Sequence, residues 1–224
     1  MENGQIQQRS KPEASLNGSV IGYDPGGNKK RGLAVLELVS GRTSSFTTKT
    51  LASVGHVLAE LDRVDDMLAL GVDTLAARHS GESGWRPADL WLRETYEPVA
   101  KSVVSPNGLY GSMGLNGMHA MIHARDNHPN LPITETHPKV LFFALTDTKY
   151  DYENNHADMD AAIAGWLGVP ATTRNDHEWD ALISAYAALQ GLRGTWPHDL
   201  LDGSMEGDDR LRFPCGRVNY WWPE

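Results

Sequence analysis

Three short β-type runs follow one another near the start of the chain, and only short turns separate them. The runs cover residues 19–24, 32–39 and 42–50, and Pro25-Gly26-Gly27 and Ser40-Gly41 mark the turns. Strands joined by such turns pair antiparallel with their neighbours. The sequence therefore predicts a three-stranded meander whose first turn carries a basic tip at residues 28–31.

An amphipathic helix and an inner strand come next. Val54, Val57, Leu58 and Leu61 recur at helical spacing and form one apolar face. Residues 67–74 are nearly all apolar, which is typical of a strand covered on both faces. Further along we predict a strand at 131–135, an edge strand at 217–222, and helices at 88–96, 115–125, 138–145, 157–167 and 176–192.

This order of elements predicts an α/β fold with a ribonuclease-H-like mixed sheet, in which three antiparallel strands precede parallel strands and helices flank the sheet. The 40% hydrophobic and 22% charged residues suit one globular domain, which we place at 18–224. We expect residues 1–17 to form a disordered polar tail. Residues 78–126 read as a helical and loop insertion or lid, and residues 196–224 as a C-terminal extension.

The single cysteine, Cys215, excludes a disulfide framework within the chain and any site built from several thiolates. No apolar run reaches the roughly 18 to 20 residues that a membrane span requires. The first residues also lack the apolar core of a signal peptide. We therefore expect a cytoplasmic protein without a membrane partner.

Four carboxylates, those of Asp24, Asp73, Glu135 and Asp180, occupy positions where burial is costly. Asp24, Asp73 and Glu135 end predicted strands, and Asp176 and Asp180 lie four residues apart on one face of the last helix. Carboxylates gathered at neighbouring strand ends repel each other, so a divalent cation or a basic partner must neutralise them. Two Mg²⁺ or Mn²⁺ ions would do so, and they would also activate a water for phosphodiester cleavage.

Each acid has a structural interpretation as well. Asp24 before Pro-Gly-Gly suits a turn, Asp73 a cap, and Glu135 a helix start. Asp176 fits an N-cap better than a metal ligand, because it stands where the last helix begins. Asp180 is the hardest to explain structurally, since it lies inside a mostly apolar helix. The argument for a metal site therefore depends on the whole set.

Four motifs carry a family resemblance through their order and spacing. They are Gly22-Tyr23-Asp24-Pro25-Gly26-Gly27, Gly71-Val72-Asp73-Thr74, Thr134-Glu135-Thr136-His137-Pro138 and His177-Glu178-Trp179-Asp180-Ala181-Leu182. Together they resemble the family catalogued as domain of unknown function 429, which is assigned to the ribonuclease-H-like superfamily and predicted to contain nucleases. The resemblance covers roughly residues 19 to 222. Many members of that family carry Asp-x-Pro where this chain has Asp73-Thr74-Leu75.

The resemblance implies a set of roles. Asp24, Asp73, Glu135 and Asp180 would be metal ligands, with Asp24 bridging two ions. The spacing of His177 and Asp180 is similar to the last-helix motif of Holliday-junction resolvases and related nucleases. By that similarity His177 would shuttle a proton.

The balance of 20 basic and 29 acidic residues gives a formal charge of −9, which argues against strong sequence-independent binding along duplex DNA. Local basic groups could still hold a nucleic-acid backbone, with Trp85 and Trp91 stacking on the bases of a single strand. A solvated turn and buried tryptophans explain the same pattern. The candidate contacts are Lys29, Lys30, Arg31, Arg86 and Arg93.

The sequence therefore favours a Mg²⁺- or Mn²⁺-dependent nuclease or phosphodiesterase whose partner is a nucleic acid of unspecified type. One alternative is a non-catalytic binding module on the same fold, in which aromatic residues such as Trp221 and Trp222 form a partner surface or a homo-oligomer contact. A second alternative is an ATP-binding phosphotransferase-like protein, because residues 24–27 resemble the first phosphate loop of sugar kinases and actin-like ATPases.

Overall fold

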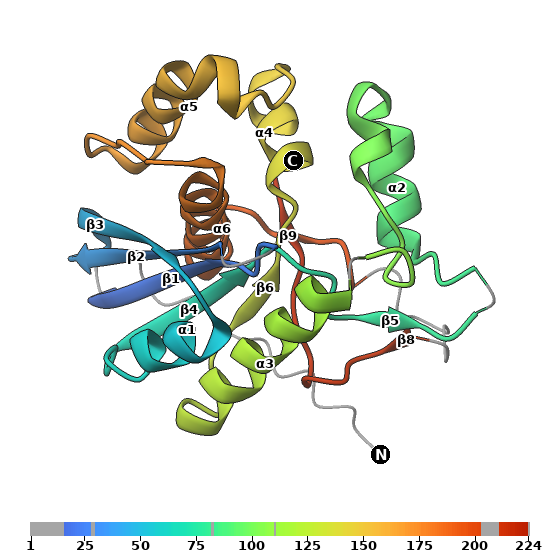
Figure 1. Ribbon diagram of the computed structural model, residues 1–224, viewed down its shortest axis with the longest axis horizontal. Helices are drawn as coiled ribbons and strands as arrows, with labels where there is room; N and C mark the ends of the chain where they lie inside the picture. The colour runs from blue at the N-terminus through green and yellow to red at the C-terminus, as the bar shows by residue number, and fades with distance from the viewer. Residues whose placement is uncertain (1–15, 28–29, 82, 110, 203–210, 224) are drawn as a thin grey trace.

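The computed structural model describes residues 16–27, 30–81, 83–109, 111–202 and 211–223. A five-stranded mixed sheet lies at its centre, with the strand order β3-β2-β1-β4-β6 (Figure 1). The strands are β1 (Gly18–Asp24), β2 (Arg31–Val39), β3 (Arg42–Leu51), β4 (Met67–Val72) and β6 (Ile133–Glu135).

The pairing of these strands confirms the predicted topology. β1, β2 and β3 form an antiparallel meander, in which Asp24 is paired with Gly32. β4 then lies parallel to β1, with Gly71 opposite Gly22, and β6 lies parallel to β4. This is the ribonuclease-H-like order, and it brings the carboxyl ends of β1, β4 and β6 to one edge of the sheet.

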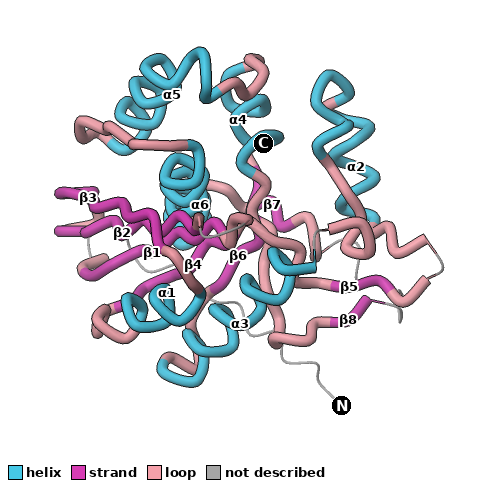
Figure 2. Tube along the Cα trace, viewed as in Figure 1, coloured by secondary structure: helices cyan, strands magenta, loops and turns pink. Residues whose placement is uncertain are grey.

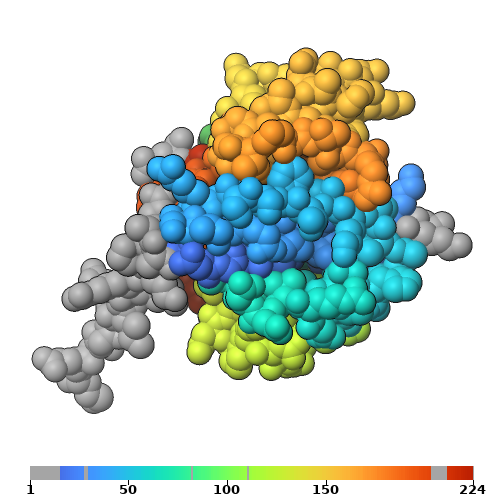
Figure 3. Space-filling view, turned by 90° about the vertical axis from the view of Figure 1, so that its left-hand side faces the viewer, coloured from blue at the N-terminus to red at the C-terminus, as the bar shows by residue number. Residues whose placement is uncertain are grey.

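Helices cover both faces of the sheet. α6 (Asp176–Arg193) crosses one face, while α1 (Val54–Leu61) and α3 (Gly111–Asn127) lie on the other (Figures 1 and 2). From the side, α4 (Pro138–Thr146) and α5 (Tyr152–Leu167) form an outer layer beyond the sheet on the side opposite α3 (Figure 3). α6 is deeply buried over most of its length, so the core of the protein lies around it.

Small residues in three neighbouring strands let the backbone of α6 come unusually close to the sheet. A Cβ atom at Gly22 would lie 1.8 Å from the carbonyl oxygen of Ala181, and one at Gly71 would lie 2.0 Å from that of Ser184. At Gly32 the corresponding distance to the carbonyl oxygen of His177 is 1.7 Å. Side chains at these positions would push the helix away, so the glycines set where its first turns lie.

The segment at 78–126 is mostly helical. It contains α2 (Pro87–Thr95), the 3₁₀ helix η2 (Glu97–Ser102) and α3, and it begins with β5 (Arg78–His79), which pairs with β8 (Leu211–Arg212). α2 and η2 stand beside the sheet rather than on it (Figure 1). α3 begins earlier and ends later than the predicted helix at 115–125.

Both ends of the described chain differ from expectation. Leu16, which we assigned to the polar tail, is buried in the core, and its carbonyl oxygen accepts a hydrogen bond from Gly41 N–H. The predicted edge strand at 217–222 contains only β9 (Trp221–Trp222), which pairs with β7 (His198–Asp199), and a parallel bridge from Asn219 to β6. The side chain of Trp222 is fully buried, so it offers no exposed aromatic contact.

None of the helices in the described ranges has the length and apolar character that a membrane crossing requires.

Candidate active site

Asp24 and His177 form the first pair of the site, at the carboxyl end of β1 and the start of α6. The Asp24 side chain is almost completely buried, and its Oδ1 accepts a hydrogen bond from Gly26 N–H at 2.8 Å. His177 Nδ1 donates to Asp24 Oδ2 at 2.5 Å. This hydrogen bond raises the pKa of the half-buried His177, because the neighbouring carboxylate favours the imidazolium.

Asp73 and Asp180 complete the cluster. Asp73 directly follows β4, and its backbone N–H donates to the carbonyl oxygen of Tyr23 next to Asp24. Burial raises the pKa of Asp73 well above its usual value, and the negative charge of Asp24 raises it further. Burial and the charges of Asp24 and Asp73 do the same to Asp180. We call Asp24, Asp73 and Asp180 the acidic edge.

One oxygen of the acidic edge makes no hydrogen bond of regular geometry. Asp180 Oδ1 is buried and accepts none from the described residues, although the Tyr150 hydroxyl lies near enough to lower the pKa of Asp180. A buried carboxylate oxygen without a donor is costly, since it has lost water and gained nothing in exchange. A bound cation or an ordered water is the usual partner of such an atom.

The donor chemistry of the acidic edge fits a hard divalent cation such as Mg²⁺ or Mn²⁺, which prefers carboxylate oxygens. The carboxylates do not converge into a finished ligand shell, since in the described ranges no three His, Cys, Asp or Glu side chains form a metal-binding group. Mg²⁺ usually keeps several waters and takes only one or two protein carboxylates together with substrate oxygens. The residues therefore suit an ion that shares its ligands with water and substrate.

Two residues beside the acidic edge were missed by the sequence analysis. The positive charge of Lys139, at the start of α4, lowers the pKa of Asp73 against the larger opposing effects. Its ammonium group also lies over the ring of Tyr150, 5.7 Å from the centroid. The Tyr150 hydroxyl is buried beside the Asp180 carboxylate. Burial raises the pKa of Tyr150, and the charge of Asp180 and a hydrogen-bonding contact with that carboxylate raise it further. Only the position of Lys139, directly after the Thr134-Glu135-Thr136-His137-Pro138 motif, could have drawn attention to it.

Glu135 occupies a different environment from the one predicted. Its Oε1 accepts hydrogen bonds from the backbone N–H groups of Ala76 and Ala77, each at 2.6 Å. Arg86 Nη1 donates to both of its oxygens, at 2.9 and 2.7 Å. Burial still raises the pKa of Glu135, and Arg86 opposes that effect. The carboxylate is thus occupied by structural partners, which corrects its interpretation as a metal ligand.

The interpretation of Arg86 as a nucleic-acid contact is wrong. Its side chain has no exposure to solvent and lies between Glu135 and Asp89. Nε and Nη2 of Arg86 donate to the two oxygens of Asp89 at 2.9 and 2.7 Å. A guanidinium held in this way between two buried carboxylates cannot reach a phosphate. It anchors α2 to the end of β6.

Arg93 is also held by structural contacts. Its Nη1 donates to the carbonyl oxygens of Ala100 and Val103, and its guanidinium lies 5.1 Å from the centre of the Trp85 ring. These contacts tie α2 to η2. Arg93 is partly exposed, and its assignment to a nucleic-acid surface stays a prediction. Arg31 Nη1 donates to the carbonyl oxygen of Ala52.

Two other predicted site residues, Lys30 and Asp176, are exposed. Lys30 is exposed in the turn that follows Asp24, and Lys29 lies outside the described residues. The Asp176 side chain is 55% exposed, and its Oδ1 lies 3.9 Å from His177 Nε2. The N-cap of α6 is Asn175, whose side chain accepts a hydrogen bond from Glu178 N–H, so Asp176 is not the cap that we expected.

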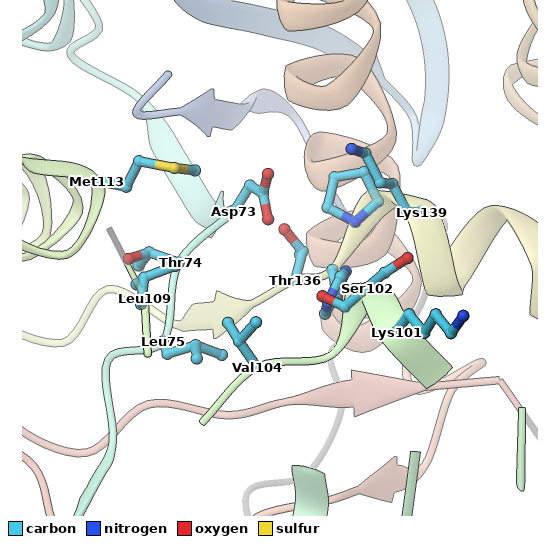
Figure 4. A pocket seen from close by; sticks show the side chains of 12 residues that line it. Asp73, Thr74, Leu75, Lys101, Ser102, Val104, Leu109, Met113, Thr136 and Lys139 are labelled. Carbon is cyan, nitrogen blue, oxygen red and sulfur yellow. The ribbon is translucent and has the colours of Figure 1, made fainter. Parts of the chain in front are cut away.

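A pocket of about 430 Å³ opens beside the acidic edge, and Asp73 forms part of its wall (Figure 4). It lies at the carboxyl ends of β4 and β6, where η2, the first turn of α3 and the start of α4 meet. His137 also lines it, and burial lowers the pKa of this histidine to about 4. The imidazole is therefore neutral near pH 7, and its Nε2 donates to the carbonyl oxygen of Ser102.

The strand order and the acids at the carboxyl edge of the sheet define an α/β domain of ribonuclease-H-like fold. No protein-family model matches the chain, and no curated protein matches it, so the motif resemblance described above has no matching family model.

The solved structures to which the chain is similar include two of RuvC. Thermus thermophilus RuvC is 17% identical, with a TM-score of 0.44, and the match covers 79% of this chain and 97% of that one. T. thermophilus RuvC in complex with Holliday junction substrate is 16% identical, with a TM-score of 0.43 and coverage of 79% and 96%.

Proposed function

We propose that the protein is a divalent-metal-dependent nuclease or phosphodiesterase of the family catalogued as domain of unknown function 429. The observation that carries the proposal is the acidic edge. The charge of Asp24 raises the pKa of both Asp73 and Asp180 beyond what burial does, and Lys139 and the Tyr150 hydroxyl lower these pKa values only in part. Such an arrangement is costly unless a cation is bound for part of the time.

Asp24, Asp73 and Asp180 would hold Mg²⁺ or Mn²⁺. When bound, the metal would supply an activated water and would stabilise the leaving oxygen of a phosphodiester. His177 holds a proton at Nδ1 against Asp24 and remains half-buried, so it is placed to move a proton at the site. Asp176 adds negative charge next to His177 on the exposed side of the acidic edge.

We propose a nucleic acid as the substrate because lysines flank the acidic edge. Lys30 is exposed after Asp24, and Lys101 and Lys139 line the pocket that Asp73 shares. Lysines on both sides of an acidic centre can hold the phosphates that flank a cleaved bond, while the net charge of −9 disfavours binding along a long duplex. We also propose a cytoplasmic location, because the single cysteine, Cys215, is a buried free thiol.

A manganese titration of the purified protein tests the metal site without any choice of substrate. We expect the wild type to bind Mn²⁺, and Asp24→Asn and Asp180→Asn to lose at least ten-fold in affinity while keeping their circular dichroism. The matched control is Asp158→Asn, the same substitution at an exposed position on α5. Asp176→Asn measures whether the exposed carboxylate near His177 contributes.

Cleavage assays then test the reaction. Branched, single-stranded and hybrid nucleic acids are incubated with Mg²⁺ or Mn²⁺, and Asp24→Asn is expected to abolish any cleavage that the wild type shows. Cleavage retained by folded Asp24→Asn would contradict the assignment. A folded wild type that neither binds Mn²⁺ nor cleaves any of these substrates would favour the binding module. ATP hydrolysis without nuclease activity would favour the phosphotransferase-like alternative.

A further inference from the structure

The pocket beside the acidic edge has two chemically different halves. Leu75, Val104, Leu109 and Met113 line one side, and Ser102, Thr136, Lys101 and Lys139 line the other (Figure 4). Its volume of about 430 Å³ lies within the roughly 300 to 1,000 Å³ of small-molecule sites, which combine apolar walls with a few polar groups. It also lies outside the carboxyl ends of parallel strands, where open α/β sheets usually bind ligands.

The apolar half faces a space that solvent reaches. Val104 is 36% exposed, although its immediate neighbour Val103 is buried. Leu109 precedes α3 and Met113 lies in its first turn, so the insertion supplies most of this wall, and Leu75 after β4 supplies the rest. A flat aromatic group with little charge, such as a nucleobase, suits a wall of this composition.

Hydrogen bonds connect Thr136 in the polar half, through Ser184, to the backbone of Asp180. The Ser184 hydroxyl donates to the carbonyl oxygen of Asp180 at 2.7 Å, so its only proton is used there. Thr136 Oγ1 lies 2.7 Å from Ser184 Oγ and must therefore be the donor in that contact. The remaining lone pair of the Thr136 oxygen can accept a hydrogen bond from a hydroxyl or amino group, such as those of a sugar or a base.

Two lysines place positive charge at the solvent opening of the polar half of the pocket. Lys101 and Lys139 are exposed, and Lys139 lies close enough to Asp73 to lower its pKa. Because His137 is neutral near pH 7, these two lysines provide the positive charge of the lining. They suit a phosphate at the opening, next to the carboxylate that would hold the metal.

We propose that the pocket binds one nucleoside monophosphate unit of the substrate, with its base against Val104, Leu109 and Met113 and its phosphate at Lys101 and Lys139. This inference rests on the proposed nuclease function, for which it supplies the substrate contact: a single unpaired nucleotide next to the cleaved bond. The enzyme would accordingly prefer a substrate with an unstacked base at that position over a continuous duplex.

The test uses nucleoside 5′-monophosphates as probes and calorimetry as the readout, in EDTA so that metal binding is not required. We expect at least one monophosphate to bind ten-fold or more tightly than its nucleoside or inorganic phosphate at the same ionic strength. Val104→Asp places a negative charge in the apolar wall and is expected to weaken that binding at least ten-fold. Val39→Asp is the matched control, since Val39 is 58% exposed and ends β2 at the opposite end of the sheet.

The outcomes separate this inference from the proposed function. If no monophosphate binds more tightly than phosphate, or if Val104→Asp binds as the wild type does, the pocket assignment is overturned even where Mn²⁺ binding and cleavage are intact. If a monophosphate binds and only Val104→Asp weakens it, the pocket assignment is supported. Loss of the proposed function would instead show as absent Mn²⁺ binding and absent cleavage with monophosphate binding retained.

Discussion

Replacing Arg86 by methionine is expected to destabilise the fold by about 3–5 kcal/mol, a cost typical of removing one partner from a buried ion pair. The structure supports the upper part of that range. The guanidinium lies between Asp89 and Glu135, both carboxylates are essentially inaccessible to solvent, and Arg86 also donates to the carbonyl oxygen of Ala77. Its removal leaves two carboxylates buried without a counter-charge.

Urea unfolding at pH 7.5, followed by circular dichroism, measures this effect. Domains of ordinary stability unfold with about 5–15 kcal/mol, so the variant is expected to fold marginally. Arg63→Met is the control, because Arg63 is 67% exposed and pairs with Glu60 at the surface, where such pairs are worth about 0–1 kcal/mol. A loss below about 1 kcal/mol for Arg86→Met would refute the buried-network interpretation and would reopen a role for Arg86 in binding.

A second variant keeps this prediction testable if Arg86→Met does not fold. Arg86→Met combined with Glu135→Gln removes one of the stranded charges, so the double variant is expected to be more stable than Arg86→Met alone by about 1–3 kcal/mol. The sign of the pH dependence gives an independent check. Without Arg86 the buried carboxyl groups must take up protons on folding, so the stability of Arg86→Met should rise as the pH falls from 7.5 to 5.5.

Three further predictions concern pH, packing and charge. The pKa of His137 is about 4 in the folded protein, so below about pH 6.5 the unfolded chain binds more protons than the folded one. The free energy of unfolding should therefore fall by about 2–3 kcal/mol between pH 7 and pH 4. In urea unfolding measured across this range, His137→Gln should show a smaller fall. Gly71→Ala should lower the free energy of unfolding by about 1–3 kcal/mol, because the new Cβ would lie 2.0 Å from the carbonyl oxygen of Ser184. The control is Gly165→Ala on α5, where a Cβ meets nothing within 4 Å. This substitution should raise the free energy of unfolding by about 0.5–1 kcal/mol. In EDTA, Asp73→Asn should increase the free energy of unfolding by about 1–2 kcal/mol and so raise the thermal midpoint, because it removes a buried charge that Asp24 repels. A lower midpoint would contradict this electrostatic explanation.

The elements that follow directly from periodicity and turn chemistry were predictable. Turn residues mark the meander, helical spacing marks α1 and α6, and a continuous apolar run marks β4. The structure places these elements within a few residues of the predicted bounds. The end of the chain was harder, because residues 217–222 form only short bridges whose partners, β7 and β6, are distant in sequence. Contacts of that kind leave no local signal.

In the candidate site, too, residues with a local sequence signal were predictable, and residues whose role depends on distant contacts were not. Asp24, Asp73 and Asp180 could be found because a carboxylate after an apolar strand, or inside an apolar helix, is conspicuous in the sequence. Arg86 and Glu135 could not be sorted correctly, since a basic residue beside tryptophans reads equally as a binding surface or as a buried partner. Only the tertiary structure shows that the two charges neutralise each other. Because Arg86 neutralises Glu135, the acidic edge is left as the group whose buried carboxylates are only partly compensated, by His177 at Asp24 and by Lys139 near Asp73.

The packing of α6 explains how the acidic edge is held against its own repulsion. His177 and Asp180 lie in the first turns of this helix, and its backbone rests on Gly22 and Gly71, one in each of the strands that end at Asp24 and Asp73. The helix cannot turn or withdraw to separate the charges without giving up the close contact with both strands. The same contact that builds the core therefore fixes the carboxylates at one edge, and a metal site needs ligands whose positions are held by rigid elements in this way.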